Sequence, residues 1–76
     1  MAMTEEQALD LVRRLLKAKD EKELSELVSA HLSMIDGTFF GVLEASAQQL
    51  EREGKAHIAK ALRGLGDRML RMKLYI

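Results

Sequence analysis

The sequence predicts an all-α fold of four short antiparallel helices, packed as a compact bundle or as paired helical hairpins. Apolar residues recur at steps of three and four through most of the chain, which is the period of a helix with one buried face. The composition is 47% hydrophobic and 32% charged with no proline, as expected of a folded helical chain. The segments between the periodic stretches are short, and short connections place consecutive helices antiparallel. The 76 residues have room for a single domain, residues 1–76.

The first helix is expected over about residues 4–18. Thr4 and Gln7 have the spacing of a capping box, in which each side chain binds the backbone N–H of the other residue. Acidic residues follow in the first turn, where the positive end of the helix dipole favours them. The expected inner face carries five apolar residues: Ala8, Leu11, Val12, Leu15 and Leu16.

The second helix is expected over about residues 21–32. Asp20 and Glu23 repeat the capping-box spacing directly at its start. One side of this helix should face the core, and it carries four apolar residues and a histidine: Leu24, Leu27, Val28, His31 and Ile35.

The third helix is expected over about residues 37–53. Asp36 and the glycine after it could open a hairpin turn, but the flanking residues lack the alternation of strands, so Asp36 is expected to cap a helix. Gly54 should end the helix in the left-handed conformation. The inner face is marked by Phe40, Leu43, Ala47 and Leu50, with Phe39 beside them.

The fourth helix is expected over about residues 55–74. Gly64 and Gly66 each weaken it by roughly 1 kcal/mol relative to alanine. The apolar period nevertheless passes through both glycines, so one bent or closely packed helix is favoured over two. We call its row of apolar residues the apolar stripe, and we interpret it as a packing or interaction surface rather than a reaction centre: Ile58, Leu62, Leu65, Met69 and Met72.

Charge is distributed unevenly along the chain. Residues 20–53 hold eight acidic and two basic residues, a net charge of −6, whereas residues 55–76 hold six basic residues and one acidic residue, a net charge of +5. The side of the fourth helix opposite the apolar stripe could bind phosphate backbones, or it could be a solvated face that also pairs with the acidic helices of its own bundle. The second interpretation is favoured because the total charge is zero and this helix has no aromatic residue for base stacking before Tyr75. We call these residues the basic face: Lys60, Arg63, Arg68 and Arg71.

His31 lies on the apolar side of the second helix. It could act as a pH sensor, a metal ligand or a catalytic base, or it could be a packed histidine that bonds a backbone carbonyl or lies at a subunit contact. The packed histidine is favoured, since a metal site needs three or four converging ligands and His57 is the only other histidine. No catalytic, cofactor-binding or metal-binding residue is predicted, and the chain is not expected to be an enzyme.

Size and composition also bear on assembly and location. The chain has no cysteine, so neither a disulfide nor a thiolate metal site can brace it. A domain this small draws only about 3–5 kcal/mol from its own core, so self-association into at least a dimer is expected. Charges interrupt every apolar run well short of about 18 residues, so we expect a soluble, cytoplasmic protein with no signal peptide and no membrane partner.

The middle of the chain contains a further pattern. Residues 28–36 read VSAHLSMID, and they are followed by apolar and glycine positions at Phe39, Phe40, Leu43, Leu50, Gly54, Ala59 and Leu62. This succession resembles a helical segment of bacterial multidomain proteins, in which an Ala-His-Pro-x-Leu-Leu stretch precedes two helices separated by a glycine, commonly beside tetratricopeptide repeats or caspase-like CHAT domains. The resemblance covers residues 20–72, with Leu32 at the position of the usual proline. It implies a non-catalytic scaffold or adaptor role, and it assigns no functional residue.

These observations predict a small protein-interaction or assembly module that buries apolar helix faces against a protein partner, with a homo-oligomer expected. The apolar stripe and His31 are the expected interaction residues, and no cofactor is expected. The alternative is a nucleic-acid-binding or regulatory domain that uses the basic face.

Overall fold

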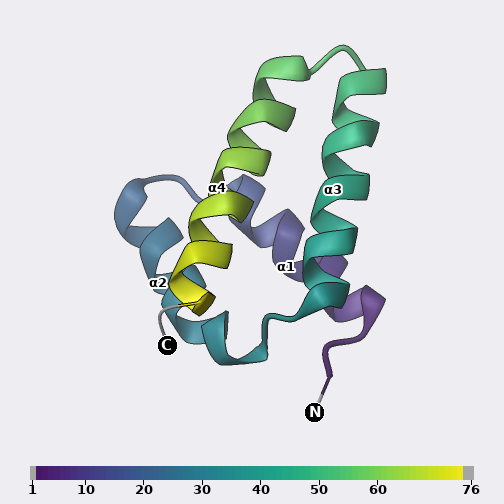
Figure 1. Cartoon of the computed structure of the whole chain (residues 1–76). Helices are drawn as coiled ribbons and strands as arrows, with labels where there is room; N and C mark the ends of the chain where they lie inside the picture. The colour runs from purple at the N-terminus through teal and green to yellow at the C-terminus, as the bar shows by residue number, and fades with distance from the viewer. Residues whose placement is uncertain (1, 75–76) are drawn as a thin grey trace.

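The predicted all-α fold is confirmed by the computed structural model, which describes residues 2–74 (Figure 1). Within these residues the chain forms four α-helices and one short 3-10 turn, and no strand. The helix bounds differ from the expected ones by at most one residue. The elements are α1 (Glu5–Lys17), α2 (Glu21–His31), η1 (Leu32–Met34), α3 (Gly37–Arg52) and α4 (Ala56–Leu74).

The most extensive helix pair is the antiparallel hairpin of α3 and α4 (Figure 1). Gly54 closes the hairpin with a φ of 79°, as predicted, because only glycine adopts this conformation without steric cost. The N–H of Gly54 donates to the carbonyl of Glu51 at 3.0 Å, and the N–H of Lys55 donates to the carbonyl of Leu50 at 2.8 Å. These two bonds satisfy carbonyls that the end of α3 would otherwise leave unpaired.

Helix α4 is continuous through Gly64 and Gly66, as predicted. Gly66 is buried against α3, and a Cβ atom there would lie 3.1 Å from both Cδ atoms of Leu43. The buried side of α4 therefore includes small residues as well as large ones. Its members are Ala59, Leu62, Gly66 and Met69.

The predicted apolar stripe of α4 is buried only in part. Leu62 and Met69 are buried, but Ile58 and Leu65 are only half-buried and Met72 is 47% exposed. Met72 is left at the surface because the glycine side of α4 faces α3.

Helix α1 packs against α3 and runs obliquely behind the hairpin in the view of Figure 1. Its capping box is present, since Thr4 Oγ1 accepts from the N–H of Gln7 and Gln7 Oε1 accepts from the N–H of Thr4, each at 3.0 Å. The expected burial of Leu16 is wrong. This side chain is 43% exposed, because the residues that meet the rest of the core are Ala8, Leu11, Val12 and Leu15.

Asp36 joins two parts of the chain. Its Oδ1 accepts from the N–H of Phe39 at 3.3 Å, which caps α3 as predicted, and its Oδ2 accepts from the N–H of Met3 at 3.2 Å. The expected order of the two phenylalanines is reversed, since Phe39 is fully buried and Phe40 is half-buried. Phe39, Leu43 and Ala47 are spaced four residues apart and are the buried residues of α3, whereas Phe40 lies at the edge of this row.

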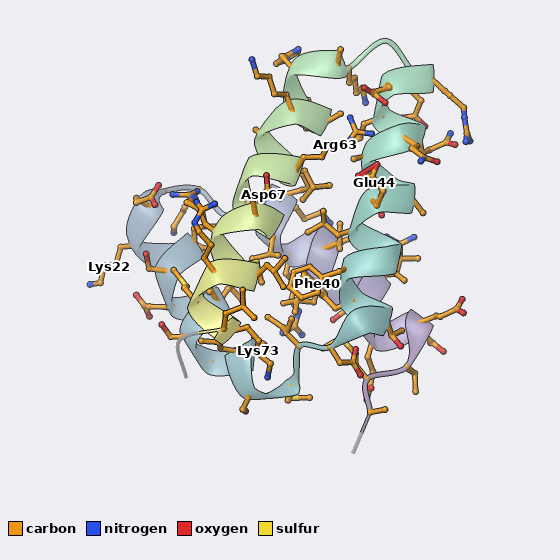
Figure 2. The ribbon with its side chains drawn as sticks, in the orientation of Figure 1. Lys22, Phe40, Glu44, Arg63, Asp67 and Lys73 are labelled. Atoms are coloured by element: carbon orange, nitrogen blue, oxygen red, sulfur yellow. The ribbon has the colours of Figure 1, made fainter. Side chains whose placement is uncertain are left out.

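Helix α2 is held by few contacts. Its only buried residue is Val28, although Asp20 Oδ1 caps it by accepting from the N–H of Glu23 at 2.8 Å. From the far end of the chain, the Nζ of Lys73 donates to the carbonyl of Leu32 at 3.1 Å. Lys73 therefore fastens the last turn of α4 to the end of α2, where Figure 2 labels it.

Candidate interaction surface

A groove about 600 Å³ in volume runs along the surface where α1 and α3 meet. Its apolar lining consists of Leu9, Val12, Leu16, Val42, Ala45 and Leu50. Leu9 and Leu16 are 37% and 43% exposed, and they lie seven residues apart on one line of α1. This surface, named here the α1/α3 groove, lies between two helices and has a mainly apolar lining.

A second groove of about 320 Å³ lies on another side of α1, where α1 meets the start of α2 and the first half of α4. We call it the α1/α4 groove. It is lined by apolar residues and by His57 and Arg68, and its apolar members are Leu15, Leu16, Leu24, Ile58, Ala61, Leu62 and Leu65.

Leu16 lines both grooves. Single exposed leucines are ordinary on protein surfaces, but a contiguous row of apolar side chains is characteristic of an interaction site. Leu16 therefore forms the ridge of a continuous apolar surface that extends from α3 across α1 to α4.

The two grooves carry opposite charge at their edges. Glu5, Glu6 and Glu53 line the α1/α3 groove together with one basic residue, Arg13, which gives a net charge of −2. Among residues 2–74, the only fully charged residue that lines the α1/α4 groove is Arg68. An acidic and a basic edge thus lie on the two sides of the Leu16 ridge.

The predicted interaction residues divide among three places. Ile58, Leu62 and Leu65 line the α1/α4 groove, although Leu62 belongs mainly to the core. Met69 and Met72, together with Leu65, line a hollow of about 180 Å³ between α2 and α4.

His31 lies apart from these residues, in a polar hollow beside α1. Its ring is half-buried, and its Nδ1 lies 2.8 Å from the carbonyl oxygen of Leu27. This contact fits the interpretation of a packed histidine.

The α1/α3 groove was missed at the level of sequence. The available signal was the width of the apolar arc on α1, where Leu9 and Leu16 flank Val12 beyond the residues needed to cover the core. Its other wall, Val42 and Leu50, could be assigned only once the pairing of α1 with α3 was known.

One residue of the basic face is occupied within the fold. Arg63 donates from Nη2 to Glu44 Oε2 at 2.7 Å and from Nη1 to Glu51 Oε2 at 2.8 Å, and Figure 2 shows Arg63 directed from α4 toward Glu44 on α3. Hydrogen bonds from Arg63 hold the pKa of both glutamates below the ordinary value, and the bonds to Glu44 and then to Glu51 raise the pKa of Arg63 itself. This is the pairing with acidic helices that the favoured interpretation expects.

The other three members of the basic face, Lys60, Arg68 and Arg71, are exposed. Asp67 interrupts them, since it lies four residues after Arg63 and four before Arg71 and therefore on the same side of the helix; Figure 2 labels Asp67 next to Arg63 on α4. The basic face therefore offers fewer free positive charges than the four residues predicted for it.

Residues 2–74 contain no cluster of three or more histidine or carboxylate side chains placed to hold a metal ion. In the same part of the chain, every buried polar side-chain atom has a hydrogen-bond partner. None of the helices described combines the length and apolar composition needed to cross a membrane.

Comparison with protein-family models, with curated proteins and with solved structures finds no significant match to this chain. The resemblance to the helical segment beside tetratricopeptide repeats or CHAT domains stays a prediction.

Proposed function

We propose that this chain is a non-catalytic assembly module that binds another polypeptide by burying the apolar residues around α1. The observation that carries the proposal is Leu16, a large side chain left 43% exposed between two apolar grooves. Burying such residues is the main favourable contribution to most protein association. The occupant is an amphipathic helix, because the α1/α3 groove has an apolar lining between two helices, one of which carries Leu9 and Leu16 at its exposed edge.

The alternative of nucleic-acid binding has less support. Arg63 is engaged by Glu44 and Glu51, and Asp67 lies among the remaining bases. A phosphate-binding surface needs several free cations in a row, since each phosphate contact contributes to affinity.

A direct binding measurement tests the proposal. The probe is a fluorescein-labelled amphipathic helix of about 18 residues made of leucine, alanine and lysine, long enough to be helical and charged to suit the acidic edge of the α1/α3 groove. Anisotropy should show saturable binding to the wild-type chain and at least about tenfold weaker binding to Leu16→Ser, which corresponds to about 1.4 kcal/mol. Leu70→Ser is the matched control, because Leu70 is 45% exposed but lines neither groove.

The nucleic-acid arm uses labelled single-stranded RNA and duplex DNA at 50 and 200 mM salt. Phosphate binding weakens steeply between these concentrations, whereas apolar contacts do not. Absence of peptide binding, or equal binding by the wild-type chain and Leu16→Ser, would refute the proposal. Salt-sensitive RNA or DNA binding without peptide binding would favour the basic face instead.

A further inference from the structure

We infer that the polypeptide bound at this surface is a second copy of the chain, in a dimer whose two-fold axis passes near Leu16. The inference rests on the proposed function, since it names the partner of the same surface. It draws on two further observations, which are the arrangement of the grooves and the charge at their edges.

The shape of the surface suits a two-fold dimer. The Leu16 ridge has the α1/α3 groove on one side and the α1/α4 groove on the other. Rotation about an axis beside the ridge lets Leu16 of each copy enter the α1/α4 groove of its partner, so that a convex side chain fills a hollow and the contact is repeated by symmetry. Both Leu16 side chains then lie at the centre of the interface, where buried apolar anchors contribute most.

The charges complement each other in the same arrangement. Glu53 lines the α1/α3 groove and Arg68 lines the α1/α4 groove, so the axis brings Glu53 of one copy to Arg68 of the other, twice per dimer. Arg68 has no carboxylate of residues 2–74 within 4.0 Å. Glu53 is held only by surface contacts, which are a bond of 3.1 Å from Gln49 and an approach of 4.0 Å from Lys55.

A second copy also meets a need that follows from size. A chain of 76 residues without cysteine has neither a large core nor a covalent brace. Burying the apolar ridge in a groove of a second copy enlarges the core without any other protein.

Sedimentation velocity from about 1 to about 500 µM tests the inference, because dimerisation depends on concentration. The wild-type mass should rise from 8.6 kDa toward twice that value. Leu16→Ser should weaken association at least about a hundredfold, since two central leucines are lost per dimer, whereas Leu70→Ser should associate as the wild type does.

Charge exchange tests the orientation. Glu53→Lys and Arg68→Glu should each weaken dimerisation about tenfold, because each reversal acts at two symmetric contacts. The double variant should regain the wild-type constant, and an equimolar mixture of the two single variants should form a heterodimer. Circular dichroism should show the same helix content in all of them, since both side chains are exposed.

Several outcomes would overturn the inference. They are a mass of 8.6 kDa at every concentration, wild-type association by Leu16→Ser, or single charge reversals that the double variant does not repair. A chain that stays monomeric yet binds the helical peptide through Leu16 would reject the dimer and leave the proposed function standing. A chain that does neither would reject both.

Discussion

Replacing Gly64 with alanine should stabilise the folded chain by about 1 kcal/mol. Gly64 lies in the interior of α4, is exposed, and has no atom within 4 Å of the position that a Cβ would occupy. The substitution therefore gains the helix propensity of alanine, about 0.8–1.0 kcal/mol, without a new contact. For a domain of this size, the gain corresponds to a rise of about 4–8 °C in the melting temperature.

Gly66→Ala is the matched comparison, only two residues away in the same helix. It gains the same propensity, but its Cβ would lie 3.1 Å from both Cδ atoms of the buried Leu43, and overpacking a core costs about 1–3 kcal/mol. Gly66→Ala should therefore be less stable than Gly64→Ala by about 1–3 kcal/mol.

Urea denaturation followed by circular dichroism measures this difference at one fixed protein concentration, because the stability of a self-associating chain depends on concentration. Gly64 lines neither groove, so its replacement should leave association unchanged. If both variants gain equally, Leu43 moves aside freely, and the close approach at Gly66 does not determine which side of α4 is buried.

Two other perturbations follow from the hydrogen bonds of the fold. Asp36→Ala should lower the free energy of unfolding more than Asp20→Ala does. Asp20→Ala loses only a helix cap worth about 0.5–2 kcal/mol, whereas Asp36 caps α3 and also accepts from the N–H of Met3. Equal losses of stability in urea denaturation would show that the bond to Met3 adds nothing. The lowered pKa of Glu44 and Glu51 means that the Arg63 ion pairs stabilise the fold above the ordinary glutamate pKa, and that this stabilisation is lost as the pH falls through the lowered values. The difference in urea midpoint between the wild type and Arg63→Gln should therefore shrink between about pH 7 and about pH 3, and a difference that stays constant would contradict the assignment.

The features that the sequence predicted correctly depend on neighbouring residues. The cap at Thr4, the cap at Asp36 and the left-handed glycine at Gly54 involve bonds within a few positions, so spacing alone indicates them. The same holds for the helix bounds, because the apolar period begins and ends at these caps.

The features that the sequence did not predict depend on how helices meet. The apolar period of α4 placed its buried side on the leucines and methionines, but α3 approaches at Gly66, which no scale of hydrophobicity favours. The exposure of Leu16 and Met72 follows from such pairings, and so does the candidate site, since both grooves have walls from helices distant in the sequence.

The attachment of α2 has a consequence for how the molecule opens. With one buried residue, against three in α3 and four in α4, α2 should cost less free energy to detach than the α3–α4 hairpin. Its amide hydrogens should therefore exchange with solvent through a sub-global opening, ahead of those in α3 and α4; exchange of all helices at one common rate would rule this out. Because Leu24 of α2 lines the α1/α4 groove, each such opening also widens that groove, so a ligand that needs Leu24 in place would slow the exchange of α2.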